Sequence, residues 1–407
     1  MIKAVSLKDT KVFSPIKVGE NEISHKIVMA PSARTRAALN EEPSDLQLKH
    51  YNDRTQFPGS LVIAEGTVLS PKTGGVWGAP GIYNHSQVQG WKKITQTIHD
   101  NNSFISLQLW ACGRVTDPKF AQYHQLPVVA PSVVYTGKEH QQSFEELGIE
   151  LKSLSTSEVE ALIKNEYTQG AKNAMAAGFD YIEIHAAHGY LIESFLHPST
   201  NKRTDKYGGS IENRARFLLE VVDHLVGLVG ASKVAIRLSP WSSYNSMITV
   251  KEEVHPYTTF SYVVNELQRR ADNGNQLAYI SLVEPRVSGA ENLEKRDQVG
   301  DNEFIRKIWK GTLIRAGNYT YDAPDFKQLL SDVDDDRTLV AFARFFTSNP
   351  DLPQRLYQGS ELAPYDRSTF YTKSAKGYNT FPALNEKSTL NDEQADALLG
   401  KPIAQQA

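Results

Sequence analysis

The chain of 407 residues has a single cysteine, Cys112. One thiol cannot form an internal disulfide, and a cysteine-based zinc site needs more than one thiolate. Long apolar runs are missing too: no stretch of about 18 apolar residues is free of charge, and the first residues, MIKAVSLKDTKVF, lack the apolar segment of a secretion signal. The sequence therefore predicts a cytoplasmic protein that does not span a membrane.

An excess of positive charge is also lacking. The chain has 44 Lys and Arg against 47 Asp and Glu, which gives a formal net charge of -3. Without a basic block to neutralise a row of phosphates, we expect no nucleic-acid partner. The 40% of hydrophobic residues can bury a large core, and this length fits either several domains or one barrel with insertions.

Eight short apolar runs alternate with amphipathic stretches along the chain. Helices are indicated by the capping-box spacings Ser44-x-x-Gln47 and Ser157-x-x-Glu160 and by apolar residues every four positions from Phe217 to Val229. The runs cover residues 26–31, 61–68, 104–110, 181–186, 233–239, 277–283, 312–318 and 338–344.

Eight successive βα units predict an α/β fold, a single (β/α)8 TIM barrel. The rival, an open doubly wound sheet, lacks its Gly-x-Gly-x-x-Gly fingerprint after the first strand. Residues 111–179 are too many for one helix and include LPVVAPSVVY, so we expect an inserted subdomain or hairpin between strands 3 and 4. The predicted barrel covers residues 1–382, and a polar, loosely held tail covers 383–407.

Polar side chains fall on the inward face of two predicted strands. Alternation along FISLQLW directs Gln108 and Trp110 into the barrel, and alternation along KVAIRLS does the same for Arg237. A buried guanidinium needs an anion. That anion is either Glu183 of the neighbouring strand or a ligand at the barrel mouth, and spacing alone does not separate the two.

The last two strands end where barrels commonly bind phosphate through small residues and backbone amides. The seventh predicted strand ends in Gly317 and Asn318, and the eighth ends in Ala343 and Arg344. Together these four residues indicate a phosphorylated ligand.

The fourth strand leads into the densest titratable cluster of the chain, His185-Ala-Ala-His188-Gly-Tyr190. If this segment turns into a helix, both imidazoles share one face and can bind either a metal or one carbonyl oxygen. No second His or Asp cluster completes a metal site, although Glu193 could contribute, so we predict no metal. Two donors on one oxygen would stabilise an enolate, and Tyr190 could act as a general acid.

Several longer motifs are specific enough to identify a family. They include Phe13-Ser-Pro-Ile-Lys-Val-Gly, Asn201-Lys-Arg-Thr-Asp-Lys-Tyr-Gly-Gly-Ser with Glu212-Asn-Arg, and Arg344-Phe-Phe-Thr-Ser-Asn-Pro-Asp. In these motifs, and in the His185 to Tyr190 segment, the chain resembles the yeast-type Old Yellow Enzymes, which are flavin-dependent ene-reductases. The likeness covers all but the tail.

The resemblance implies an NADPH dehydrogenase that holds FMN non-covalently and reduces the activated C=C bond of α,β-unsaturated carbonyl compounds. In such enzymes hydride passes from flavin N5 to the β-carbon. By this likeness His185 and His188 hold the substrate carbonyl, and Tyr190 protonates the α-carbon. Small-molecule enones and phenolic ligands are the implied partners, and the assembly is a monomer or homodimer.

The resemblance also implies positions around the cofactor. Arg237 would stabilise the reduced flavin, Gln108 would bind its pyrimidine edge, and Gly66 would place its amide near N5. The remaining implied contacts are the phosphate site of Gly317, Asn318, Ala343 and Arg344, and the substrate walls Trp110 and Tyr378.

Three positions depart from the brewer's-yeast pattern. Ala33 stands where a threonine hydrogen-bonds flavin O4, which predicts a lower flavin potential. His188 replaces an asparagine and Ala343 replaces a glycine.

Three other functions stay open on the sequence: a binding protein for phenols and steroids, an isomerase, and a flavin-free aldo-keto reductase. The presence of Tyr190 favours reduction over the first two.

Overall fold

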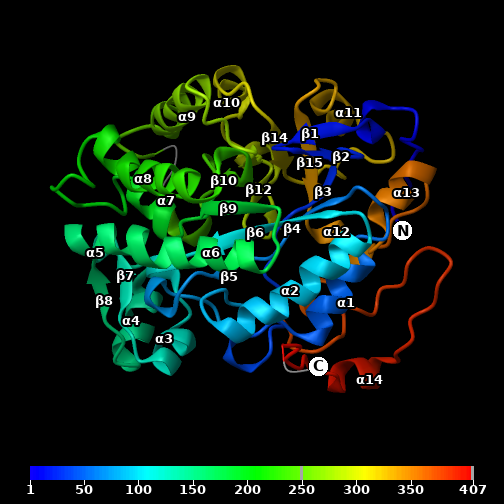
Figure 1. Ribbon diagram of the computed structural model, residues 1–407, viewed down its shortest axis with the longest axis horizontal. Coiled ribbons are helices and arrows are strands. Elements are labelled where there is room, and N and C mark those ends of the chain that lie inside the picture. Colours follow the sequence, from blue (N-terminus) through cyan, green and yellow to red (C-terminus); the bar gives the residue numbers. More distant parts are fainter. Residues whose placement is uncertain (248–250, 405–407) are drawn as a thin grey trace.

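A computed structural model describes residues 1–247 and 251–404 of the chain, and eight parallel strands close into a barrel at its centre (Figure 1). Each predicted apolar run contains one of these strands. Pairing of β15 with β3 and of β4 with β6 closes the ring, and the short β5 (Thr67–Val68) extends the pairing with β6. In order around the barrel the strands are β3 (Ile27–Met29), β4 (Leu61–Ile63), β6 (Phe104–Trp110), β9 (Tyr181–Ala186), β10 (Val234–Leu238), β11 (Tyr279–Val283), β14 (Leu313–Ala316) and β15 (Thr338–Phe342).

Helices surround the barrel because alternate strand side chains face outward. On β6, Ile105, Leu107 and Leu109 join the main hydrophobic cluster with the helices, as alternation predicts. The helices are α1 (Asp45–Asp53), α2 (His85–Asp100), α6 (Thr168–Ala176), α7 (Leu191–Leu196), α8 (Ile211–Val229), α9 (Pro256–Asp272), α10 (Glu303–Ile308), α11 (Lys327–Asp332), α12 (Arg344–Ser348) and α13 (Leu352–Gln358).

The two predicted capping boxes can be compared with the observed starts of helices. The Ser44 and Gln47 capping box is present at the start of α1. The second box lies two residues before its predicted place, because Ser155 and Glu158 cap α5 (Thr156–Ala161).

The amino-terminal end of the barrel is closed by the hairpin β1 (Ile16–Val18) and β2 (Asn21–Ile23). Its apolar side chains pack in an inner cluster with Tyr181 and Tyr279. The Tyr181 hydroxyl donates to the Val18 carbonyl at 2.8 Å. With this end filled, the carboxyl ends of the strands are the place for a ligand.

The predicted insertion between the third and fourth strands is a βαβ subdomain. It contains α3 (Pro118–His124), β7 (Val128–Ala130), α4 (Lys138–Glu146) and β8 (Leu151–Ser153), followed by α5. Because β7 and β8 pair in parallel across α4, a hairpin is excluded. A small core of its own, centred on Phe144, holds the subdomain together.

The tail is not loosely held, contrary to the expectation from its composition. Its helix α14 (Asp392–Ala397) buries Ala395, and Ile403 is 1% exposed. A bridge between Ser44 and Pro402 returns the chain to the start of α1. Apolar contacts and main-chain pairing thus anchor a segment of polar composition, while residues 405–407 lie outside the described part.

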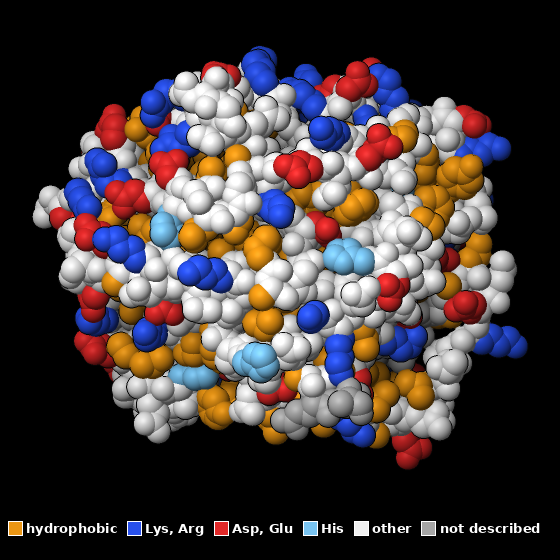
Figure 2. Space-filling model, viewed as in Figure 1, with side chains coloured by type: hydrophobic (Ala, Val, Ile, Leu, Met, Phe, Trp, Pro, Cys, Tyr) orange, Lys and Arg blue, Asp and Glu red, His pale blue; other side chains and the backbone are white. Residues whose placement is uncertain are grey.

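The helices of the described residues include none with the length and apolar character needed to cross a membrane. On the face drawn in Figure 2, acidic and basic side chains are interspersed. This agrees with the nearly balanced charge of the sequence.

Candidate active site

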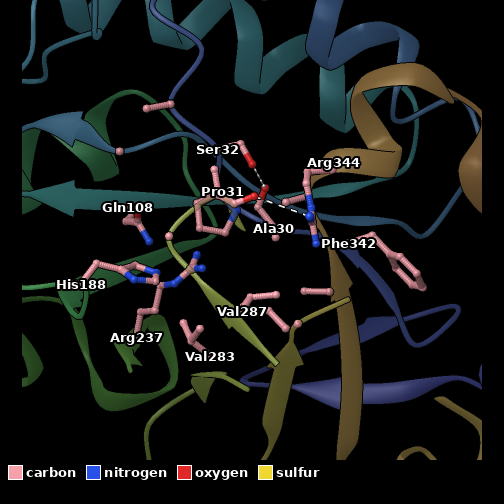
Figure 3. Close-up of a pocket in the computed structure, with 18 of the residues that line it drawn as sticks. Ala30, Pro31, Ser32, Gln108, His188, Arg237, Val283, Val287, Phe342 and Arg344 are labelled. Carbon is pink, nitrogen blue, oxygen red and sulfur yellow. Dashed lines mark hydrogen bonds between the residues drawn. The ribbon is translucent and has the colours of Figure 1, made fainter. Parts of the chain in front are cut away.

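A pocket opens at the carboxyl ends of the strands, on the side opposite the β1–β2 hairpin. Most of the predicted site residues line it: Ala33, Gly66, Gln108, Trp110, His185, His188, Tyr190, Arg237, Gly317, Asn318, Ala343 and Arg344. In Figure 3, Gln108, His188 and Arg237 lie on one side of this pocket and Arg344 lies across from them. The pocket therefore has two chemically different ends.

At one end, Arg237 is a buried cation without a hydrogen-bond partner on its Nε atom. Its neighbour Glu183 accepts a hydrogen bond from Gln108 Nε2 at 2.6 Å, and its second oxygen is also unpartnered. Burial raises the pKa of Glu183 while the positive charge of Arg237 opposes that rise. No ion pair joins the two side chains, so the Arg237 guanidinium can still bind an anionic or carbonyl group in the pocket.

Small residues line the pocket between its two ends, and larger side chains at two of them would collide with their neighbours. A Cβ atom at Gly66 would lie 2.8 Å from Cε3 of Trp110, and one at Gly317 would lie 2.7 Å from Cβ of Glu284. Ala30 and Ala316 contribute further small surfaces. A planar ring system fits between such walls, with Arg237 and Gln108 available to its polar edge.

At the other end, the predicted phosphate-binding residues come together. Gly317 and Asn318 follow β14, and Ala343 and Arg344 join β15 to α12. Arg344 also contacts Tyr365, whose hydroxyl lies 3.3 Å from Nη1. A guanidinium beside small residues at the end of adjacent parallel strands suits a phosphate.

The sequence allows a helix for the segment from His185 to Tyr190. The structure shows no helix there. His185 lies on β9, and His188 and Gly189 form a tight turn with φ values of 58° and 74°. This turn places the imidazole centroids 6.1 Å apart and the Tyr190 ring 4.8 Å from that of His185. The three rings thus meet at the pocket by a turn and not by a shared helix face.

A hydrogen bond sets the tautomer of His185, and a second contact allows the same tautomer for His188. The Ala187 N–H donates to Nδ1 of His185 at 3.4 Å, so this nitrogen carries no proton and Nε2 is the N–H donor. Nδ1 of His188 lies 3.4 Å from the Ser242 hydroxyl, which can donate to it in the same way. Both side chains then have an Nε2–H free for a ligand.

All three groups are held in their neutral forms. Burial lowers the pKa of His188 to about 3 and that of His185 well below its usual range, with the positive charge of Arg237 adding to both shifts. Burial raises the pKa of Tyr190 well above its usual range. Two neutral donors and one neutral acid are what carbonyl binding and proton donation need.

The structure offers no metal site for this cluster. Within residues 1–247 and 251–404, no three His, Cys, Asp or Glu side chains gather as ligands. Glu193, the possible third ligand, binds the Gly189 N–H and the Ser239 hydroxyl.

Tyr378 was wrongly placed in the substrate wall. It is fully buried and stacks on His50 with ring centroids 3.9 Å apart, with Arg34 and Arg36 over its ring. The pocket is instead lined by Tyr371, whose side chain is partly exposed at the mouth. Both tyrosines belong to one irregular segment without periodicity, so alternation could not decide which faces the pocket.

Sequence reasoning missed other lining residues, notably Ser32, Tyr244 and Phe370. Ser32 follows the first strand, a position that could have been found by extending the strand-end argument to every strand. Tyr244 lies on the 3-10 turn Tyr244–Ser246 after β10, and Phe370 directly follows the 3-10 turn Arg367–Thr369; no pattern in the sequence marks either side chain.

Arg36 anchors the segment that carries Phe370 and Tyr371. Its buried guanidinium donates to the carbonyls of Phe370 at 2.7 Å and Ser374 at 3.0 Å, and to others nearby. We expect Arg36→Met to lower the free energy of unfolding by about 3 kcal/mol, because several buried carbonyls lose their donor. The Michaelis constant for the substrate should rise as well, since one pocket wall loosens.

A matched control for this variant is Arg337→Met. Arg337 also donates to main-chain carbonyls, those of Arg306 and Trp309, but at the opposite end of the barrel. Thermal unfolding and substrate kinetics of both variants separate the two effects. If Arg337→Met raises the Michaelis constant as much as Arg36→Met does, the wall has no special dependence on Arg36.

A comparison with protein families decides what this pocket belongs to. The family described as NADH:flavin oxidoreductase / NADH oxidase matches residues 11–363. The chain belongs to this family. The flavin oxidoreductase class predicted from the sequence is thereby confirmed, and FMN with a reduced nicotinamide as electron donor follows from membership.

Two curated relatives of this flavin oxidoreductase are similar over nearly their whole length. One is a "Probable NADPH dehydrogenase" of Candida albicans, 50% identical over 406 residues, with 99% of this chain and 96% of the relative covered. The other is "Enoate reductase 1" of Kluyveromyces lactis, 40% identical, with 93% and 96% covered. Both are enzymes by name.

Solved structures agree. The Old Yellow Enzyme from Pichia sp. AKU4542 superposes with a TM-score of 0.91 at 43% identity, covering 98% of this chain and 100% of that one. Morphinone reductase superposes with a TM-score of 0.79 at 34% identity, covering 94% and 98%. The predicted barrel and the predicted likeness to the Old Yellow Enzymes are both confirmed.

Proposed function

We propose that this flavin oxidoreductase uses NADPH to reduce the activated C=C bond of α,β-unsaturated carbonyl compounds. The observation that carries the proposal is the convergence of His185, His188 and Tyr190, all neutral, on one pocket. Relatives named NADPH dehydrogenase and enoate reductase support it. Phenols, which resemble the enolate form, are expected to bind in the same place.

The residues present fit FMN. Arg237 and Gln108 would hold the pyrimidine edge of its ring, Gly66 would lie beside the ring, and Ala33 would lie near O4. Gly317, Asn318, Ala343 and Arg344 would hold the phosphate. The unpartnered Nε atom of Arg237 supports this placement, because a buried guanidinium is stable only beside an acceptor.

Bound FMN would supply the hydride chemistry that links oxidation of NADPH to reduction of the alkene at its β-carbon. The Nε2–H groups of His185 and His188 bind the carbonyl oxygen and stabilise the negative charge that develops on it. Tyr190 gives its phenolic proton to the α-carbon, which completes a saturated ketone. Trp110 and Tyr371 shape the walls between which the alkene lies.

The neutral state of the two imidazoles matters for this scheme. An imidazolium would bind the carbonyl more strongly at first, but the pKa values of both side chains are lowered far below 7. Burial also raises the pKa of Tyr190 well above its usual range, so we expect this group to be protonated at neutral pH and able to donate to the α-carbon.

The proposal is tested by product analysis. Purified enzyme, NADPH and 2-cyclohexenone are incubated without oxygen, and the products are separated by gas chromatography. We expect one cyclohexanone for each NADPH oxidised. Isomerised or unchanged enone, with no saturated ketone, would favour an isomerase or a binding protein and reject the proposed reduction.

Ala33 offers a separate test of the flavin placement. An alanine cannot donate a hydrogen bond to O4, so the reduced flavin lacks that stabilisation. We expect Ala33→Thr to raise the reduction potential of the flavin, measured by an anaerobic redox titration against a reference dye. Ala33→Ser supplies the same hydroxyl with less bulk and should act in the same direction. No rise in either variant would contradict the placement of O4 at residue 33.

A further inference from the structure

The turn that carries His188 is held by a buried carboxylate outside the pocket. Glu193 lies on α7 and is 1% exposed. One of its oxygens accepts the Gly189 N–H, and the other accepts the Ser239 hydroxyl at 2.8 Å. Ser239 in turn accepts the His188 N–H at 2.7 Å. The carboxylate thus binds both N–H groups of the turn, one directly and one through Ser239.

We propose that Glu193, acting through Ser239, is a positioning residue that orients His188 toward the substrate carbonyl. This inference rests on the proposed function for the role of His188, while the hydrogen-bond chain itself does not. Neither Glu193 nor Ser239 lines the pocket, so neither touches the substrate.

A carboxylate is required here because two donors approach two different oxygens. An ionised glutamate offers only acceptors, whereas a glutamine would set an NH2 group against one of the donors. The need for support is local: both His188 and Gly189 have positive φ values, and for a residue with a Cβ atom that conformation is costly. The Asn245 side chain adds one more contact by donating to the His188 carbonyl at 2.8 Å.

Charged groups face Glu193 from several elements. Arg114 lies on the 3-10 turn Gly113–Val115, His197 ends α7, and Glu252 comes from the loop after β10. Burial raises the pKa of Glu193 to about 7; Glu252 adds to the rise, and His197 and the two hydrogen bonds oppose it. Glu252 is itself bound to His197 at 2.8 Å.

This environment makes the turn sensitive to pH. Above about pH 7 the carboxylate accepts from both partners. Below it, the added proton either faces the Gly189 N–H or turns the Ser239 hydroxyl from donor to acceptor, and either change disturbs the chain that ends on His188. Enone affinity should therefore fall as the pH drops through about 7. His185, His188 and Tyr190 do not titrate in that range, so they cannot produce the same step.

The test compares Glu193→Gln and Ser239→Ala with the wild-type holoenzyme. Loss of one such hydrogen bond should raise the Michaelis constant for 2-cyclohexenone about tenfold at pH 8, with kcat within about twofold. The double variant should be no worse than the poorer single variant, because both changes break one chain. Wild type should lose affinity between pH 8 and pH 6, and Glu193→Gln should not.

Asp180→Asn is the matched control. Asp180 also accepts a main-chain N–H, that of Ile105 at 2.8 Å, and contacts His99 at 3.1 Å, but it lies before β9 at the far end of the barrel. This variant should alter the unfolding temperature and leave the Michaelis constant unchanged. A general loss of rigidity would raise the Michaelis constant in all variants alike.

A signal independent of turnover completes the experiment. In protein labelled with ¹⁵N-histidine, the main-chain amide of His188, assigned by its loss in His188→Asn, should shift across pH 7 in wild type and stay constant in Glu193→Gln. If Michaelis constant, pH step and amide signal are all unchanged by Glu193→Gln, the positioning role is rejected. If wild type does not reduce the enone at all, the proposed function is rejected and the amide signal alone decides the role of Glu193.

Discussion

Tyr190→Phe is expected to slow the reoxidation of reduced enzyme by 2-cyclohexenone by a factor of about 10² to 10⁴, the range typical of a lost general acid. Under the proposed function the phenol would be the proton source, because its raised pKa keeps it protonated and its ring packs against His185 and Trp110. Reduction by NADPH needs no proton from this group and should keep its rate. Anaerobic stopped-flow absorbance follows the two half-reactions separately.

The matched control is Tyr244→Phe. Tyr244 lines the same pocket and its ring lies 6.0 Å from that of His188, but its side chain reaches solvent. Loss of this hydroxyl should change the reoxidation rate no more than a few fold. Equal slowing in both variants, or none in Tyr190→Phe, would remove Tyr190 as the acid.

His185→Ala has the second large effect. Removing one of two preorganised donors to a developing negative charge costs about 10² to 10³ in rate. The imidazole is neutral and buried, so its loss changes no charge and leaves a cavity beside Trp110. We expect kcat/KM for the enone to fall by that factor while FMN stays bound.

His188→Asn serves as the comparison, because an amide also donates a hydrogen bond. Its kcat/KM should stay within about tenfold of wild type. Steady-state kinetics at saturating NADPH measure both variants. If His185→Ala retains wild-type kcat/KM, the carbonyl does not lie between the two imidazoles.

Strand alternation explains why so much of the pocket could be predicted. The period of two along a buried strand decides which side chains face inward, and Gln108, Trp110 and Arg237 lie where it predicts. Barrel closure then brings the ends of β9, β10, β14 and β15 to one mouth, so residues more than 100 positions apart in the chain meet.

Irregular segments have no such period, so the sequence does not predict which of their side chains face the pocket. The choice between Tyr371 and Tyr378 depends on how Arg36 holds the segment between them, a contact that spans more than 300 residues of chain. The anchored tail is a similar case, since its few apolar residues bind surfaces that the fold creates. Composition alone could describe the tail as polar but not show where it returns.

The chemistry of the histidines also needed the structure. Spacing grouped His185, His188 and Tyr190, but the turn geometry, the tautomers and the direction of each pKa shift come from Ala187, Ser242 and burial. From the sequence, Glu193 is considered only as a possible metal ligand. In the structure its carboxylate hydrogen-bonds the turn from outside the pocket.

The visible absorption spectrum of the purified protein examines the proposed reaction in one experiment. We expect a flavin band that bleaches when NADPH is added without oxygen and returns when 2-cyclohexenone follows. A flavin band that responds to neither reagent would contradict the two half-reactions, and a colourless protein that cannot take up FMN would contradict the flavin site.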